Sequence, residues 1–212
     1  MKCKICLYEG PFNKRHIVMC RFGGGKLVRH ECPNCNVIFG TEDMINMSEE
    51  DLGAAYEKLY KSGHKESSAT ARQLNILKYL SPKPSGQYLN WGSGQSALVK
   101  PGITVSNYDP YIVGNEPILN DKLDLQVYDG IMSCNFIEHL QDPVEVLKNM
   151  LNYLKPAGVM AHGTPCYRYK YEYTKFHLYF FLGKSVDIMA ARAGLIAVRT
   201  SDPDVILYKG NK

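Results

Sequence analysis

The 212-residue sequence has no long apolar run, no signal peptide and no strong excess of one charge. A membrane-spanning helix needs roughly 18 consecutive apolar residues, a length that no apolar run here approaches. The N-terminal segment MKCKICLYEG also lacks the continuous apolar stretch of a secretory signal. The formal net charge is only +4 and the basic residues are scattered, which argues against a nucleic-acid partner and leaves a small anionic molecule open. We therefore expect a cytoplasmic protein that does not contact membranes.

Only three of the seven cysteines lie outside two C-x-x-C pairs. Those pairs are CKIC, with Cys3 and Cys6, and CPNC, with Cys32 and Cys35. Each pair places two sulfurs on one tight turn, and two facing turns complete a tetrahedron around a structural zinc ion. The alternative is that the four are unrelated buried thiols. The remaining cysteines are expected to be buried and unreactive, with no disulfides in a reducing compartment: Cys20, Cys134 and Cys166.

These pairs divide the chain into three predicted parts. Residues 1–42 are expected to form a zinc-ribbon module with a hairpin tip at 22–26. The segment 43–65 has a helical apolar rhythm and predicts a linker helix. Residues 66–212 are expected to form one larger domain, because the chain is long enough for an α/β domain with a small appendage.

Strands and helices are predicted to alternate from about residue 86 onward. The strands are GQYLNW (86–91), one within PGITVSNYDP (101–110), YDGIMSCNF (128–136) and VMAHGTP (159–165). One helix is capped by Asp142 and stopped by residues 156–158, and another covers 184–195, capped by Ser185 and ended by Gly194. The last two strands, IAVRT and DVILYKG, are expected to form an antiparallel pair. The predicted fold class is α/β, a Rossmann-like, mostly parallel sheet with a terminal antiparallel hairpin, preceded by the zinc ribbon.

The stretch LNWGSGQS lies at the first strand-to-helix turn of this sheet, where ligands of such folds approach. Glycines are useful at Gly92 and Gly94 because a Cβ would hold a ligand away from the backbone. Asp109 ends the next strand and is suited to bind the two hydroxyls of a ribose. The pattern G-x-G-x-x-G is not completed, which argues against a phosphate cradle.

Residues 66–208 resemble a class I S-adenosylmethionine-dependent methyltransferase. LNWGSGQS is similar to the glycine-rich first motif and NYDP to the acidic second motif. The segment YDGIMSCNFIEHLQDPVEVLKNMLNYLKPAGVMAHGTP resembles the fourth and fifth motifs nearly end to end. An N-terminal four-cysteine module before this domain resembles sugar methyltransferases that act on nucleotide-linked deoxysugars. The resemblance implies these cofactor-binding residues: Asn90, Trp91, Gly92, Ser93, Gly94, Asp109, Pro110 and Asn135.

Two features depart from the family pattern. Asn90 stands where the family usually has an aspartate that contacts the amino-acid end of the cofactor, so the charge attraction is lost. The segment between Asp109 and Tyr128 is short, and the acidic residue expected near the adenine is not clearly placed; Asp121 and Asp124 are candidates. These departures leave open a domain that binds the cofactor weakly or does not catalyse.

Three residues are candidates for removing a proton from the acceptor. Glu138 and His139 follow the fourth-motif strand, at the sheet edge where a base belongs. His139 is the preferred base because an imidazole titrates near neutral pH, although the Glu-His pair could simply orient a loop. His177 could face the same cleft or be structural, and His162 is expected to be a core histidine. The alternation of tyrosines with basic residues over 167–175 could give a two-faced ribbon that stacks on a sugar or base, a lid or a dimer contact.

We therefore predict a methyltransferase that acts on a small acceptor, a carbohydrate or a nucleotide-linked sugar, and that forms a homodimer. One alternative is methylation of RNA or another macromolecule with the zinc ribbon as the docking module. The other is a non-catalytic, methyltransferase-like binding protein. The sequence does not identify the acceptor or the methylated atom.

Overall fold

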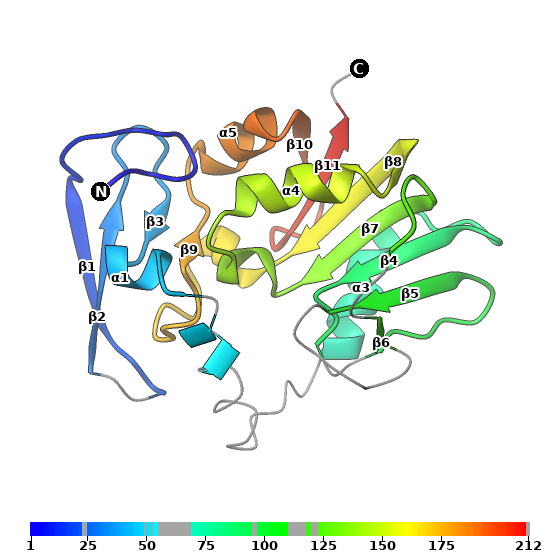
Figure 1. Ribbon diagram of the computed structural model, residues 1–212, viewed down its shortest axis with the longest axis horizontal. Helices are drawn as coiled ribbons and strands as arrows, with labels where there is room; N and C mark the ends of the chain where they lie inside the picture. Colours follow the sequence, from blue (N-terminus) through cyan, green and yellow to red (C-terminus); the bar gives the residue numbers. More distant parts are fainter. Residues whose placement is uncertain are drawn as a thin grey trace.

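Two β-sheets, one small and one large, organise the chain (Figure 1). The computed structural model describes residues 1–22, 25–48, 50–51, 53–54, 69–94, 97–109, 118–119 and 123–210. The small sheet has the strand order β1-β2-β3-β9, and the large sheet has the order β10-β11-β8-β7-β4-β5-β6. None of the described helices has the length and apolar character that a bilayer span needs.

The small sheet is built mainly by the N-terminal segment. Strands β1 (Lys14–Met19) and β2 (Lys26–Glu31) form an antiparallel hairpin, as predicted, although residues 23 and 24 at its tip lie outside the described residues. Strand β3 (Ile38–Phe39) pairs with β2, and α1 (Glu42–Ile45) follows it. Most of the predicted linker helix over 43–65 lies outside the described residues.

The fourth strand of the small sheet comes from the C-terminal part of the chain. Strand β9 (Tyr179–Phe180) pairs antiparallel with β3, and Figure 1 shows it at the edge of the small sheet that faces the large sheet. No sequence pattern predicted this pairing. The predicted division of the chain at residues 42 and 65 stays a prediction. A strand from the predicted C-terminal domain completes the sheet of the N-terminal module.

The large sheet has the predicted Rossmann-like form. Its parallel strands are β4 (Gln87–Trp91), β5 (Thr104–Tyr108), β6 (Ile118–Leu119), β7 (Tyr128–Cys134) and β8 (Leu154–Gly163). The antiparallel pair β10 (Leu195–Arg199) and β11 (Val205–Gly210) closes one edge, which confirms the terminal hairpin. Strand order reverses between β4 and β7, and the crevice for ligands lies beyond the carboxyl ends of the strands at such a point.

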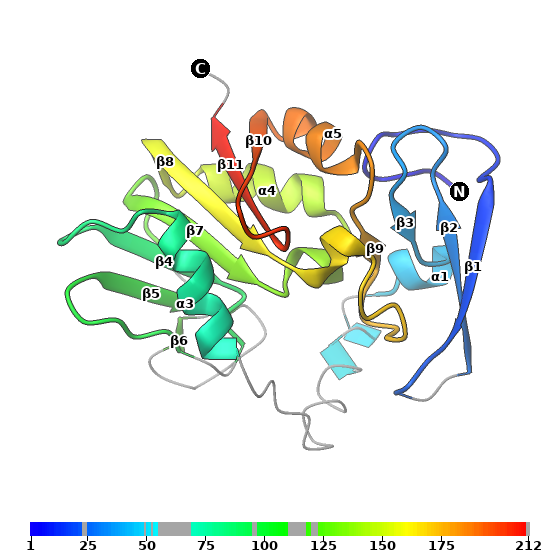
Figure 2. The ribbon, with the colours of Figure 1, turned by 180° about the vertical axis from the view of Figure 1, so that it is seen from behind.

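Helices cover both faces of this sheet. Helix α3 (Ala69–Tyr79) packs on one face against β7 and β8, and α4 (Pro143–Leu151) and α5 (Ser185–Arg192) lie on the other, as comparison of Figures 1 and 2 shows. The predicted cap of α4 is confirmed, because Asp142 accepts a hydrogen bond from the Glu145 amide at 3.1 Å. Two short 3-10 helices, η1 (Ile137–His139) and η2 (Pro165–Arg168), follow β7 and β8.

Two predicted helix limits are wrong. Helix α4 ends at Leu151, before the predicted stop at residues 156–158, because Leu154 already pairs with Tyr128 as the first residue of β8. Ser185 does not cap α5; it is the first helical residue, fully buried, and Lys184 holds the cap position. The predicted end at Gly194 is confirmed by its φ of 77°.

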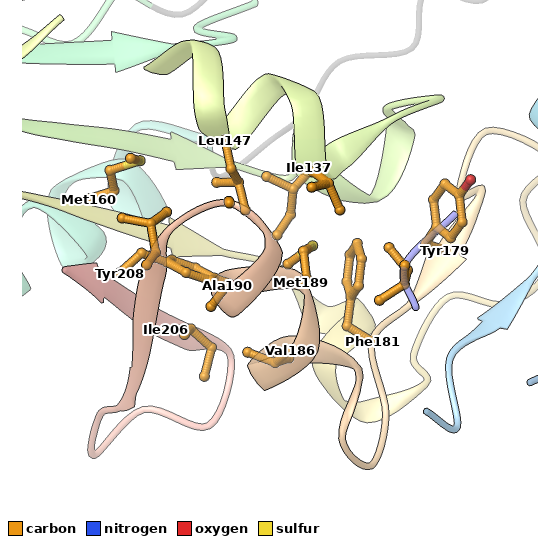
Figure 3. Packing of buried hydrophobic residues seen from close by; sticks show 14 of the residues in the cluster. Ile137, Leu147, Met160, Tyr179, Phe181, Val186, Met189, Ala190, Ile206 and Tyr208 are labelled. Atoms are coloured by element: carbon orange, nitrogen blue, oxygen red, sulfur yellow. The ribbon is translucent and has the colours of Figure 1, made fainter. Parts of the chain in front are cut away.

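The main hydrophobic core lies between the large sheet and α4 and α5 (Figure 3). Met189 and Val186 of α5 and Leu147 of α4 point into it in that view. The same contiguous cluster continues through Tyr179 and Phe39 to the buried cysteine turns of the small sheet. The two sheets therefore share one core, and the small sheet is fixed in place beside the end of the large one.

Candidate functional site

The glycine-rich turn lies at the carboxyl end of β4 and is fastened to the end of β5. The amides of Gly92 and Ser93 donate to the Tyr108 carbonyl at 2.8 and 3.1 Å, and the Gly94 amide donates to Asp109 Oδ2 at 2.9 Å. Both glycines have positive φ, 69° and 58°. Gly92 also requires glycine sterically, because a Cβ there would lie 2.2 Å from the Phe136 ring.

The glycine-rich turn leaves space beside Gly94. A Cβ at Gly94 would meet no heavy atom within 4 Å, so the turn faces open space. The Asp109 carboxylate borders this space and remains 9% exposed. A carboxylate at this place suits ribose hydroxyls. Pro110, another predicted cofactor residue, lies outside the described residues.

Asn90 has a structural partner that explains why this position is not an aspartate. Its Nδ2 donates to Asn107 Oδ1 at 3.0 Å, and both side chains are buried. Asn107 Oδ1 also accepts from the Leu98 amide at 2.7 Å, and Asn107 Nδ2 donates to the Leu98 carbonyl at 3.1 Å. A carboxylate at position 90 would face an oxygen that acts as acceptor. The described part of residues 92–103 contains no helix, and this hydrogen-bond network holds the segment after β4 instead.

The other predicted cofactor residues lie around the turn. Trp91 is buried and packs edge-on against Tyr108 and Tyr153, with ring centroids 4.9 and 5.4 Å away, so its ring supports β4 from the side of α4. Asn135 adopts φ 49°, and its amide donates to the Gly163 carbonyl at 2.8 Å, which ties the ends of β7 and β8 together. Asp124 is exposed, and Asp121 lies outside the described residues.

The predicted base lies beyond β7, in η1. His139 Nδ1 is 2.8 Å from the Phe176 carbonyl oxygen. A carbonyl only accepts, so Nδ1 carries a proton and Nε2 is the basic nitrogen of the neutral ring. Burial lowers the pKa of His139 to about 4, although the bond to the Phe176 carbonyl acts in the opposite direction. The neighbouring Glu138 is fully buried, and its Oε1 accepts from Thr164 Oγ1 at 2.5 Å.

His177 lies close to both residues. Its ring meets the His139 ring edge-on, with centroids 5.0 Å apart. Its Nδ1 is 3.4 Å from Cys166 Sγ. Burial lowers the pKa of His177 and raises that of Cys166. Cys166 is buried, as predicted, but its contact with a candidate base was not foreseen. His162 is a buried histidine hydrogen-bonded to Ser133 at 2.6 Å, in agreement with the prediction of a core residue.

Arg29 of β2 holds the segment that carries His177. It is fully buried and donates to the carbonyl oxygens of His177 at 2.7 Å, Thr174 at 2.7 Å and Glu172 at 2.9 Å. Its guanidinium carbon also lies 4.7 Å from the centroid of the Phe180 ring. We call residues 171–178 the strap. Arg29 was missed, although its position two residues after Leu27 on the alternating strand KLVRHE indicates a buried face.

The predicted two-faced ribbon over residues 167–175 is wrong. Residues 165–168 form η2, and Tyr169 and Tyr171 both have positive φ, 54° and 59°. The Cys166 amide donates to Thr164 Oγ1, which starts the 3-10 turn and breaks the alternation of an extended chain. Tyr167 instead hydrogen-bonds Tyr208 through the two hydroxyl oxygens at 3.1 Å.

The four paired cysteines converge and fit a zinc ion. Their sulfur atoms all lie within 4.8 Å of one another. The Sγ–Sγ distance is 3.8 Å between Cys3 and Cys35 and 3.5 Å between Cys6 and Cys32, whereas a tetrahedron with Zn–S bonds of about 2.3 Å has edges of about 3.8 Å. Hydrogen bonding to Cys35 lowers the pKa of Cys3 to about 6.

The two cysteine turns have the same local geometry. The residue after the second cysteine of each pair, Leu7 or Asn36, has positive φ, 62° or 66°. The Leu7 amide donates to the Cys3 carbonyl at 2.8 Å, and the Asn36 amide donates to the Cys32 carbonyl at 2.9 Å. Two copies of one turn thus present four thiols to a common centre.

Two cavities flank the strap and η2. One, of about 260 Å³, lies between β2, α1 and the strap and is lined by Met44, Met47, Phe176 and the lysines Lys26 and Lys175, among others. The second, of about 360 Å³, lies near η2 and the β10–β11 turn. Its arginines are engaged with carboxylates, Arg168 with Asp204 and Arg199 with Asp187. The first cavity is therefore the better match to an anionic ligand.

Residues 64–197 match the family model described as a methyltransferase domain. The fold is similar to that of Burkholderia thailandensis 1,6-didemethyltoxoflavin-N1-methyltransferase, solved with 1,6-didemethyltoxoflavin and S-adenosylhomocysteine, with a TM-score of 0.61, 11% identity, and coverage of 87% of this chain and 99% of that one. It is also similar to an Aquifex aeolicus SAM-dependent methyltransferase, with a TM-score of 0.53, 15% identity, and coverage of 72% and 95%. No curated protein matches the chain.

Proposed function

The chain belongs to the methyltransferase-domain family, because the family model matches more than half of it, and we propose that it methylates a small acceptor, a carbohydrate or nucleotide-linked sugar. As a class I S-adenosylmethionine-dependent methyltransferase, it would draw its methyl group from that cofactor. The observation that carries the proposal is the position of His139, whose ring is oriented by the Phe176 carbonyl at the same sheet edge as the glycine-rich turn.

Asp109 and the backbone at Gly94 would hold the cofactor. When bound, S-adenosylmethionine supplies an electrophilic methyl group on a positively charged sulfur. The Asp109 carboxylate would bind the ribose hydroxyls beside the open space at Gly94. Phe136, the residue before η1, packs on Gly92, so the glycine-rich turn touches the segment that leads into η1 and His139.

His139 would act as the base. With Nδ1–H bound to the Phe176 carbonyl, Nε2 is the basic nitrogen that would take the proton of the acceptor's hydroxyl. The bound cofactor would supply the methyl group to that oxygen and leave as S-adenosylhomocysteine. The neutral ring, with its proton on Nδ1, is already in the protonation state that a base requires. His177 lies against the His139 ring and restricts its rotation.

The cavity beside the strap supports a nucleotide-linked acceptor. Met44, Met47 and Phe176 provide an apolar floor for a ring, and Lys26 and Lys175 provide positive charge for phosphates. The cavity is close to the base because Phe176 both lines it and orients His139. Small-molecule sites commonly combine such an apolar surface with a few charged groups.

The four-cysteine cluster is proposed to hold a structural zinc ion. Its support is the pair of matching turns and the sulfur distances that fit a tetrahedron. All four positions of the tetrahedron are then taken by cysteine, so no position is left for a substrate. The ion would stabilise the small sheet and take no part in methyl transfer.

The test is the His139→Asn variant with a panel of nucleotide-linked sugars, scored by formation of S-adenosylhomocysteine. Turnover should fall roughly 10²- to 10⁴-fold while S-adenosylmethionine affinity by calorimetry stays unchanged. An unchanged rate would eliminate His139 as the base and favour Glu138 or His177. Turnover of RNA but of no sugar in the panel would replace the small acceptor by a macromolecule, and failure of the parent protein to bind the cofactor would indicate a binding protein.

A further inference from the structure

A second group of metal-binding side chains lies outside the four-cysteine cluster. Glu138, Cys166 and His177 each place one donor atom so that the three atoms lie within 4.8 Å of one another. They come from three separate segments, η1, η2 and the strap, that meet beyond the carboxyl ends of β7 and β8. Glu138 and Cys166 are fully buried. We propose that these three residues bind a second divalent transition-metal ion, zinc by their chemistry.

The distances within the group suit coordination. Cys166 Sγ lies 3.4 Å from His177 Nδ1. In a tetrahedral site with Zn–S of about 2.3 Å and Zn–N of about 2.0 Å, the sulfur and nitrogen are about 3.5 Å apart. A thiol and an imidazole alone would also hydrogen-bond at such a distance. The carboxylate within the same reach is what favours an ion over a simple pair.

Neighbouring groups orient each ligand as the residues around metal sites do. Thr164 Oγ1 donates to Glu138 Oε1 at 2.5 Å, which directs the carboxylate to coordinate through its other oxygen. The His177 carbonyl accepts from Arg29 at 2.7 Å, which holds the backbone of this ligand in place. The Thr164 hydroxyl in turn accepts from the Cys166 amide at 3.1 Å, so one threonine holds two of the ligands.

The charges of the group balance those of a divalent cation. One carboxylate and one thiolate carry two negative charges, and a neutral imidazole adds none, so the loaded site has no net charge. Charged groups are costly to bury unless they are paired or coordinate a metal. The Arg29 guanidinium nearby is engaged with three carbonyl oxygens of the strap.

Three protein ligands differ from the four of the cysteine cluster. Sites with three protein ligands keep a fourth position for water or substrate, whereas four-cysteine sites are closed. The open position would lie at the edge of the large sheet where His177 meets the His139 ring. The site stands independently of the proposed sugar acceptor, because it rests on the ligand set and not on the identity of the substrate.

The test is the zinc content of the purified full-length chain, measured by mass spectrometry after reconstitution with Zn²⁺ and removal of free metal. The parent protein should hold about two ions per chain, and Cys166→Ala and Glu138→Gln about one. Cys134→Ala is the matched control, since it removes another buried cysteine outside both clusters and should keep about two.

Circular dichroism would establish that each variant is folded. If Cys166→Ala does not fold, Glu138→Gln carries the test, because glutamine retains an oxygen that accepts from Thr164. About one ion in the parent protein would overturn the proposal. The proposal would also be overturned if the parent protein held about two zinc ions per chain and both ligand variants held the same number. An equal loss of zinc in Cys134→Ala would overturn it as well.

Discussion

The carboxyl edge of the large sheet has two halves that differ in what they bury. At the ends of β4 and β5, the polar contacts are those of a turn: backbone amides, one carboxylate and the Asn90–Asn107 pair. At the ends of β7 and β8, a carboxylate, a thiol, imidazoles and a guanidinium meet in a small volume. We refer to the first as the proposed cofactor half and to the second, which contains these reactive side chains, as the proposed acceptor half.

The small sheet is attached to only one of these halves. Strand β3 pairs with β9, and Arg29 holds the strap that carries His177. Among the described residues, no hydrogen bond is found between the N-terminal cysteine module and the turn at 92–94. We infer that the module positions the proposed acceptor half and leaves the proposed cofactor half to the large sheet, so that each half can be disturbed without the other.

Loss of the proposed structural zinc should have the largest effect. Structural zinc sites in small modules contribute about 10 kcal/mol or more, which is comparable to the whole stability of a domain. The double variant Cys32→Ser/Cys35→Ser is expected to lose the small sheet and to melt without the parent's cooperative transition, measured by circular dichroism. Cys20→Ser, a cysteine outside the cluster, should melt like the parent. Parent-like melting of the double variant would contradict a zinc-dependent module.

Removal of the Arg29 guanidinium should affect the acceptor half alone. Arg29→Met leaves the carbonyls of residues 172, 174 and 177 without their donor, which should cost about 3 kcal/mol in denaturant unfolding. Cofactor affinity should be unchanged. Arg199→Met is the control, because its salt bridge with Asp187 is exposed and contributes about 1 kcal/mol at most. Equal losses in the two variants would remove the special role of Arg29.

Asp109→Ala tests the cofactor half. Loss of a charge-assisted pair of hydrogen bonds should weaken S-adenosylmethionine binding by about 2 kcal/mol, roughly thirtyfold. Calorimetry measures this directly, and metal content should stay the same. Asp124→Ala, an exposed carboxylate, should bind like the parent. If Asp109→Ala binds equally well, the ribose is held elsewhere.

Acid should destabilise the fold through His162, the core histidine of β8. Burial lowers its pKa from 6.5 to about 3, so the folded state keeps the ring neutral while the unfolded chain takes up a proton. The stability present above pH 6.5 is therefore lost progressively as pH falls from 6.5 towards 3, by about 1.4 kcal/mol at pH 5.5. Denaturant titrations at pH 7.5 and 5.5 should show a smaller acid loss in His162→Gln. An equal loss in both proteins would mean that His162 does not titrate in this way.

Much of the large sheet could be predicted because its strands and helices carry local signals. The strand around Asn90, the Asp142 cap and the left-handed Gly194 each depend on a few neighbouring residues, and the cysteine pairs have a spacing that only a few structures use. The position of the Asp109 carboxylate could be predicted because it lies at the end of a predicted strand, β5.

The missed features depend on contacts between distant segments. Strand β9 has two residues, too few to show alternation, and exists because β3 pairs with it. Helix α4 was predicted too long because pairing of Leu154 in β8 prevailed over helical periodicity. Arg29 reaches carbonyl groups more than 140 positions away in the sequence, and no local pattern encodes such a partner.

The most direct test of the central claim, that the cysteine module holds the acceptor half and not the cofactor half, is amide hydrogen exchange in Arg29→Met compared with Arg199→Met. We expect faster exchange in the strap, including Leu178, whose amide donates to the Glu138 carbonyl at 2.8 Å. Exchange at Gly92 and Gly94 should stay at the level of the control. Faster exchange at the glycine-rich turn, or an unchanged strap, would contradict it.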